Sequence, residues 1–337
     1  MPGPSTPTDA GAFFAAVKAR DHQAVRACLE ADAALVSATD DSSFDAPAVI
    51  LAAGRGDRDM IDLLLSFGAN IDQKSGWWAG GFTALNSGHP RDLHRDGLAD
   101  FLIDRGATVD AHSAAGLGRF ERLRALVAAD PAVVHEPGGD GLRPLHYAAT
   151  PEIAAFLLDH GAEIDARDGD HHGTAAQWNI LARPDVSRFL VERGAAADLF
   201  LHVPLGDAAA VRAAAAADPA ALEAVSEHGS APGGHVHEYT VAGRTGATPL
   251  MVASRWSSPE MVDLLLSLGA RIETAPRGVT ALHYAAWGGR VDNARRLVEA
   301  GAPLSPRDEE YGASPLGWAG HFGSREVAGY LAGAGAE

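Results

Sequence analysis

A short segment rich in Asp and His is the part of this sequence best equipped for chemistry. Asp168 and Asp170 directly precede the adjacent histidines His171 and His172. A carboxylate can orient an imidazole so that the second ring nitrogen faces a ligand, which suits acid–base chemistry or a divalent metal. Neighbouring residues of a hairpin usually point to opposite sides, however, and this argues against joint ligation. We therefore predict no metal here, and a solvated loop tip remains the alternative to a site.

Two further histidines lie in the segment GHVHEY. His235 and His237 fall on one side of the chain if it is extended, and Glu238 follows directly. Two imidazoles without a defined third ligand are only a weak indication of zinc. The segment belongs to a polar, Gly-rich stretch, residues 223–246, and a connection of that length is usually either functional or disordered. As an ordered element it could close over a ligand as a lid.

Tryptophans are the second group of candidates. Trp77 and Trp78 lie in a Gly-flanked segment with no helical pattern. An exposed Trp is a typical anchor for a binding partner, whereas a buried Trp covers the neighbouring core, and both alternatives stay open. Other aromatic residues fall on predicted first helices near matching repeat positions: Trp178, Trp256, Tyr284, Trp287 and Trp318. They could line a groove for a peptide or a flat organic ligand, or pack between neighbouring helices.

The elements that must position these residues come from a repeated unit, which is clearest in GVTALHYAAWGGRVDNARRLVEAG, residues 278–301. Thr280 can cap the exposed N–H groups of a first helix. After the turn at Gly288 and Gly289, apolar residues recur at helical spacing and predict a second helix. Gly301 can end that helix in the left-handed conformation. Each unit is thus predicted to be a pair of short helices.

The unit recurs about ten times, with three regular copies in residues 247–337. Seven copies in residues 9–222 are more worn, and the first, fourth and seventh lack the turn motif. Residues 223–246 interrupt the series as a long loop, and residues 1–8 are predicted to be a disordered tail. A fixed period of this kind favours one continuous solenoid with a shared core over two globular domains.

The segments TPLM, TALHYAA and RPLHYAA and the repeated Gly-Ala closures resemble ankyrin repeats, and the Trp-rich fingers are similar to those of stand-alone bacterial ankyrin proteins. The resemblance implies an all-α ankyrin repeat solenoid of about ten helix pairs with short hairpin fingers. It implies that Thr83, Thr174, Thr248, Thr280 and Ser314 are caps, and that His146 and His283 join neighbouring repeats. Members of this family mainly bind other proteins on the concave face made by fingers and first helices, and the resemblance implies no activity.

Charge and cysteine content exclude several classes of function. The chain has 27 Lys and Arg against 44 Asp and Glu, a net charge of -17, which opposes binding to nucleic acid and to anionic membranes. Cys28 is the only cysteine, so a disulfide framework is excluded. The sequence has no basic-then-apolar leader and no apolar run long enough to span a bilayer, so we expect a cytoplasmic location.

We therefore expect a binding scaffold without a cofactor. Its fingers, residues 72–82 and 165–173, and its aromatic first helices would hold a protein or peptide partner in the groove. The predicted binding residues are Trp77, Trp78, His171, His172, Trp178, Trp256, Tyr284, Trp287 and Trp318. The alternative is a protein that binds a small molecule in the groove and converts it, with His172 as general acid or base and Asp168 orienting it.

Overall fold

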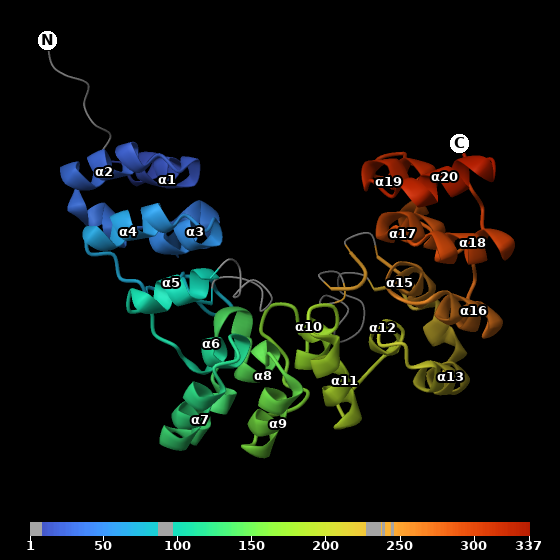
Figure 1. Cartoon of the computed structure of the whole chain (residues 1–337), viewed down its shortest axis with the longest axis horizontal. Helices are drawn as coiled ribbons and strands as arrows, with labels where there is room; N and C mark the ends of the chain where they lie inside the picture. The colour runs from blue at the N-terminus through green and yellow to red at the C-terminus, as the bar shows by residue number, and fades with distance from the viewer. Residues whose placement is uncertain (1–8, 87–96, 227–236, 238–239, 244–245) are drawn as a thin grey trace, which may run out of the picture. The chain divides into compact units, whose positions relative to one another are not determined.

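Short helices make up most of the regular structure. The computed structural model describes residues 9–86, 97–226, 237, 240–243 and 246–337 (Figure 1). The chain divides into two units, Met1–Asp170 and His171–Glu337, called unit 1 and unit 2 below. Among the residues so described, no helix is both long enough and apolar enough to cross a bilayer.

Unit 1 is a series of helix pairs in which each first helix is followed by a second helix. Its helices are α1 (Ala10–Ala19), α2 (His22–Ala31), α3 (Ala48–Gly54), α4 (Arg58–Ser66), α5 (Leu98–Asp104), α6 (Ala111–Gly116), α7 (Phe120–Ala129), α8 (Pro144–Tyr147) and α9 (Pro151–Asp159). First helices pack on first helices, as α1 does on α3 and α6 on α8, and α2 packs on α4.

Short 3-10 turns and one small sheet join these helices. The 3-10 turns of unit 1 are η1 (Ala33–Ser37), η2 (Asp41–Ser43), η4 (Pro131–His135) and η5 (Gly139–Gly141). Strands β1 (Thr39–Asp40) and β2 (Ala46–Pro47) pair antiparallel. The two strands and the residues that connect them form the first finger. A finger is thus a hairpin that leads into the first helix of a repeat.

Unit 2 repeats the same arrangement. Its elements are α10 (Ala175–Asn179), α11 (Pro184–Glu192), α12 (Leu199–His202), α13 (Ala208–Ala217), η6 (Pro219–Glu223), α15 (Pro249–Trp256), α16 (Pro259–Ser267), η7 (Pro276–Gly278), α17 (Ala281–Gly288), α18 (Val291–Glu299), α19 (Pro315–His321) and α20 (Arg325–Gly333). The first helices α15, α17 and α19 pack in sequence, and so do the second helices α16, α18 and α20.

Local hydrogen bonds explain where the first helices begin. The Thr174 hydroxyl accepts from Gln177 N at 3.4 Å, and the Gln177 side chain accepts from Thr174 N at 2.9 Å. In the same way, His283 Nδ1 accepts from Thr280 N at 3.1 Å. The other ring nitrogen of His283, Nε2, lies 3.2 Å from the Ala313 carbonyl oxygen of the next repeat. Burial lowers the pKa of His283, which favours the neutral ring. Thr174, Thr248, Thr280 and Ser314 are N-caps as predicted, and the inter-repeat role of His283 is confirmed. No described helix begins at Thr83, so its predicted capping role stays a prediction.

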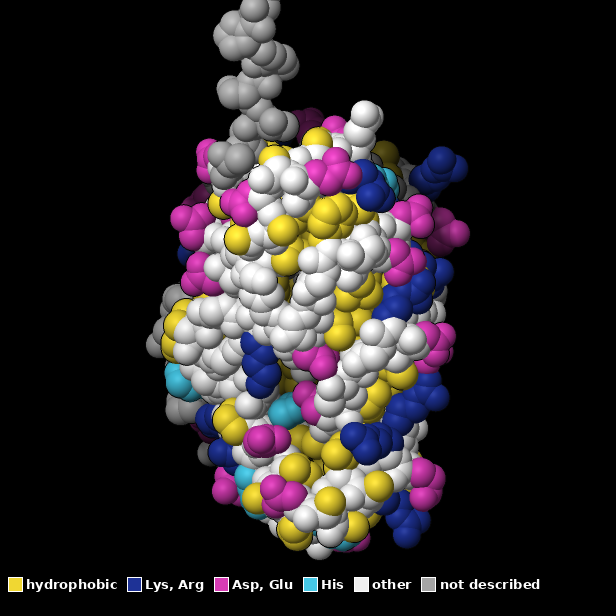
Figure 2. Space-filling model, turned by 90° about the vertical axis from the view of Figure 1, so that its left-hand side faces the viewer, with side chains coloured by type: hydrophobic (Ala, Val, Ile, Leu, Met, Phe, Trp, Pro, Cys, Tyr) yellow, Lys and Arg dark blue, Asp and Glu magenta, His cyan; other side chains and the backbone are white. Residues whose placement is uncertain are grey.

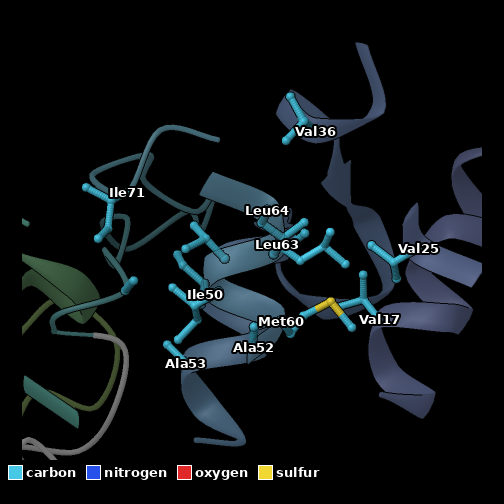
Figure 3. Packing of buried hydrophobic residues seen from close by; sticks show 14 of the residues in the cluster. Val17, Val25, Val36, Ile50, Ala52, Ala53, Met60, Leu63, Leu64 and Ile71 are labelled. Carbon is cyan, nitrogen blue, oxygen red and sulfur yellow. The ribbon is translucent and has the colours of Figure 1, made fainter. Parts of the chain in front are cut away.

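The core lies between the helix pairs and runs from one pair to the next. In unit 1, Met60 of α4 packs beside Val17 of α1 and Val25 of α2, and all three are buried (Figure 3). Each apolar stripe therefore covers the neighbouring repeat as well as its own. This is the packing expected when single repeats are too small to bury their own apolar face.

Candidate binding surface

Three aromatic rings from two successive fingers form an exposed patch on unit 1. Phe44 lies between β1 and β2, and its ring centroid is 4.4 Å from that of Trp77 in an edge-on contact. Trp78 lies beside Trp77 at 5.8 Å. Phe44 is 64% exposed and Trp78 is 70% exposed, whereas Trp77 is partly buried. We call these three residues the finger aromatic patch.

Buried Asp40 holds the tip that carries Phe44. Its carboxylate accepts from Ser42 N at 3.2 Å and from Ser42 Oγ at 2.8 Å, and it forms an ion pair with Lys18 at 2.6 Å. Burial by itself would raise the pKa of Asp40, but the hydrogen bonds from Lys18 and Ser42 outweigh it and lower the pKa to about 2. Phe44 and Asp45 have positive φ angles of 59° and 51°, so the tip takes a conformation that needs such support.

Replacing Asp40 with Asn is expected to destabilise the protein by about 1 to 2 kcal/mol at pH 7, since a charge-assisted bond network is lost. The folded pKa of Asp40 lies below its unfolded value, so this contribution is present above about pH 4 and is lost as the pH falls toward 2. Urea denaturation of both proteins at pH 7 and pH 3 tests this. A difference that is the same at both pH values would contradict the prediction.

Glycines let the fingers of unit 1 pack backbone to backbone. Gly80 has a φ of 122°, and a Cβ atom there would lie 2.2 Å from the Gly138 carbonyl oxygen. Gly141, with a φ of 73°, meets Gly169 in the same way, and Gly169 N donates to the Asp140 carbonyl oxygen at 2.7 Å. Trp77 and Trp78 are therefore carried by a finger that lies against the finger of the fifth repeat.

The Asp and His residues predicted as a site are divided between the two units. Buried Asp168 accepts from Asp170 N at 3.0 Å near the end of unit 1. His171 and His172 begin unit 2; His171 is partly buried with its ring 5.3 Å from that of Trp178, and His172 is exposed with a φ of 54°. A catalytic pairing of His172 with Asp168 stays a prediction.

The predicted aromatic residues of unit 2 occupy three different positions of the first helix. Trp178 and Trp318 come four residues after their caps, Trp287 comes seven after, and Trp256 comes eight after. Trp178 and Trp318 are buried, and so is Tyr284, whereas Trp256 and Trp287 are partly exposed. Only the later positions therefore present a ring face at the surface.

Trp287 is the centre of a connected group of rings on α15, α17 and α19. Its centroid lies 5.5 Å from that of Phe322 and 6.0 Å from that of Trp318. The Arg255 guanidinium carbon lies 3.1 Å from the Trp287 ring centroid and 4.2 Å from that of Trp256. We call these five residues the aromatic–arginine surface.

Arg255 and Phe322 did not appear among the residues predicted from sequence. The signal that could have found them is repeat position, because Arg255 occupies the same place after its cap as Trp287 does, and Phe322 the same place as Trp256. Equivalent positions of successive repeat units lie side by side in the stack, as the packing of α15 on α17 and of α17 on α19 shows. Listing side chains by position in the unit would therefore have brought these residues together.

The described end of the long loop lies against this surface. The Trp256 indole N–H donates to the Val241 carbonyl oxygen at 2.8 Å, and the Tyr284 hydroxyl donates to that of Ala242. Gly243, with a φ of 72°, is so close to Trp287 that a Cβ atom would lie 2.9 Å from the indole ring. These contacts fix residues 240–243 beside the rings.

His237, one of the two histidines considered for zinc, is 2% exposed. Its Nε2 lies 2.8 Å from Asp198 Oδ2 and 3.4 Å from the Gln177 amide nitrogen. Burial would raise the pKa of Asp198, but the bond from His237 outweighs it and lowers the pKa. His237 thus anchors the loop to two repeats, while His235 and Glu238 lie outside the described residues.

Charges of both signs are mixed over the face of the molecule shown in Figure 2. Lys and Arg side chains alternate there with Asp and Glu side chains, and hydrophobic patches lie between them. Several surface arginines are paired, for example Arg143 with Glu163 at 2.8 Å. Such a face lacks the continuous basic stripe that a phosphate backbone requires.

Two family models match the chain. A model described as ankyrin repeats in three copies matches residues 174–308, and one described as an ankyrin repeat matches residues 140–169. Among solved structures, the chain is similar to the human ASB11 ankyrin repeat domain, with 25% identity, a TM-score of 0.43, and coverage of 66% of this chain and 96% of that chain.

The matches confirm ankyrin repeats, and the fold is an all-α ankyrin repeat solenoid. Repeats of this class generally mediate interactions between proteins, using surfaces that the stacking of successive units creates.

Proposed function

We propose that this chain is a binding scaffold that holds a protein or peptide partner with its fingers and first helices, in the ankyrin groove. One observation supports this most strongly. The large hydrophobic side chains that are exposed among the described residues are Phe44, Trp78, Tyr311 and Phe322. The first three lie on fingers and the fourth ends a first helix, and none lies on a second helix.

Phe44 and Trp78 are gathered by their contacts with Trp77, and gathered exposed apolar residues mark interaction sites, whereas scattered ones need no explanation. Trp is the residue type most often found at the energetic centre of an interface. The finger aromatic patch is therefore our candidate for the partner's main anchor on unit 1.

The net charge of -17 agrees with a protein partner rather than nucleic acid or an anionic membrane surface. The stand-alone bacterial ankyrin type and a cytoplasmic location belong to the same proposal. Of the predicted binding residues, Trp78 is the most exposed tryptophan and the best point for a test.

Replacing Trp78 with Ala is expected to weaken partner binding about 10- to 100-fold, because a truncated interface Trp costs roughly 1.5 to 3 kcal/mol. The full chain is used as bait, a stoichiometric partner is recovered and purified, and its dissociation constant is measured by calorimetry with both proteins. Trp78 is 70% exposed, so the same change should leave the melting temperature nearly unaltered.

Tyr330→Ala is the matched control, since it removes a partly exposed aromatic ring from second helix α20. It should bind the partner as the unmodified chain does. Equal affinity of the Trp78→Ala protein and the unmodified chain, or a larger loss in the control, would contradict the proposed surface.

A further inference from the structure

Arg255 is held between two indole rings at the end of α15. Its guanidinium carbon lies 3.1 Å from the ring centroid of Trp287 and 4.2 Å from that of Trp256. Gly288 makes this possible, because a Cβ atom there would lie 3.0 Å from Arg255 Cγ and 3.0 Å from its carbonyl oxygen. Arg255 therefore packs against the last residue of α17, where that helix has no side chain.

The Arg255 guanidinium has no carboxylate partner among the residues that the structure describes. Other arginines do have one: Arg105 pairs with Asp62, and Arg271 pairs with Glu223 at 3.2 Å.

The lack of a carboxylate partner for Arg255 on the described surface has a cost. Arg255 is partly buried beneath the two rings, and this burial lowers its pKa to about 10. A partly desolvated cation without a counter-charge is unfavourable, and an anion from outside would remove that penalty.

A second cation stands beside it. The Arg290 Nε–H donates to the main-chain carbonyl oxygen of Arg255 at 3.0 Å, and no ion pair is formed by Arg290 within the described part of the chain. Arg290 thus binds the main chain of Arg255, and Trp287, which the Arg255 guanidinium covers, lies beside the exposed ring of Phe322 in an otherwise acidic protein. The local charge is complementary to an acidic group and opposite in sign to that of the whole chain.

We propose that Arg255 binds an Asp or Glu side chain of the partner, and that an apolar residue next to it in the partner's segment packs on Trp287 and Phe322. A guanidinium stacked between ring faces presents its N–H donors at its edges, where a carboxylate can accept two of them. This inference rests on the proposed scaffold function and specifies the chemistry that the aromatic–arginine surface recognises.

The test uses the full chain and a random peptide library displayed within a carrier loop, so that no peptide contributes a terminal carboxylate. Selected peptides are expected to share an acidic residue with an apolar neighbour. Arg255→Gln is expected to weaken their binding about 10- to 100-fold, measured by fluorescence anisotropy on blocked synthetic copies. Changing the acidic residue of a peptide to its amide should cause a similar loss, and the two changes together should add little further.

Two variants separate recognition from damage to the fold. Arg295→Gln on second helix α18 removes an exposed arginine paired with Asp292 and should bind the peptides normally. Arg255→Lys keeps the charge but not the planar fork, so part of the loss should remain. Melting temperatures of all variants are compared, since a loss that follows unfolding would appear for every peptide equally.

The inference is overturned if no peptides are selected, if they lack an acidic residue, or if Arg255→Gln binds them unchanged. The experiments distinguish failure of the proposed carboxylate site from failure of the scaffold proposal. A partner that is lost with Trp78→Ala but bound normally by Arg255→Gln would contradict the carboxylate site and leave the scaffold standing.

Discussion

Replacing Gly80 with Ala is expected to lower the free energy of unfolding by about 3 kcal/mol or more. Two costs add at this position. A non-Gly residue is strained at a φ of 122°, and its Cβ atom would lie 2.2 Å from the Gly138 carbonyl oxygen, which is main chain and cannot rotate away. The fingers of the third and fifth repeats would have to separate, and Trp78 would move with the first of them.

Gly68→Ala is the control for Gly80→Ala. Gly68 also has a positive φ, 88°, but nothing lies within 4 Å of a Cβ atom there. Its replacement should cost only about 1 to 2 kcal/mol, from backbone strain alone. Chemical denaturation measures both values, and partner affinity reports the displacement of Trp78. Equal destabilisation by the two substitutions would show that the fingers do not depend on close backbone contact.

Replacing Asp308 with Ala is expected to cost about 2 to 4 kcal/mol, because several buried donors lose their acceptor at once. Asp308 is 3% exposed. Its Oδ1 accepts from Glu310 N at 3.0 Å and from Tyr311 N at 2.6 Å, and its Oδ2 accepts from Ala313 N and Trp318 Nε1, both at 3.0 Å. The whole last finger is therefore organised by one carboxylate.

The same residue gives a pH dependence. Burial would raise the pKa of Asp308, but the hydrogen bonds from Tyr311 N, Trp318 Nε1 and Ala313 N outweigh it and lower the pKa. Its stabilisation is thus complete above the unfolded pKa of about 3.9 and is lost as the pH falls through the folded value. Asp308→Asn should reduce the acid sensitivity of unfolding as well as the stability at pH 7.

Glu309→Ala serves as the neighbouring control, since Glu309 is exposed and its main-chain N–H still donates to the Arg277 carbonyl oxygen. It should change the free energy of unfolding by less than about 0.5 kcal/mol. Thermal and urea denaturation would show the contrast. If both substitutions had the same small effect, the Asp308 carboxylate would not be what organises the last finger.

Local pattern was enough to predict the helix pairs. Thr280 and His283 are three residues apart, and their capping bonds form within a single turn, so the sequence alone indicates where the helix begins. The same holds for the closing glycines such as Gly68 and Gly301, whereas α2, α7 and α13 end at an Asp. The ankyrin fold follows from these local signals because each repeat contacts only its neighbours.

The candidate surfaces were less accessible to sequence reasoning. Trp178 and Trp318 were predicted with Trp256 and Trp287, yet the first two are buried between repeats and the second two reach the surface. A shift of three or four residues keeps a side chain on nearly the same helix face but moves it about one turn along the axis, so Trp256 and Trp287 lie at the ends of their helices. The sequence determined which aromatic residues stand on the first helices, but their place along the helix relative to the packed neighbouring repeat decided which are exposed.

The sequence by itself determined the repeat, its caps and closing glycines, and the acidic charge. These features depend on residues a few positions apart or on composition. Tertiary structure alone decided that Arg255 lies between Trp256 and Trp287, that Gly80 meets Gly138, and that His237 is buried against Asp198. The reason is physical: such contacts join residues tens of positions apart, and their geometry depends on how one repeat is placed on the next.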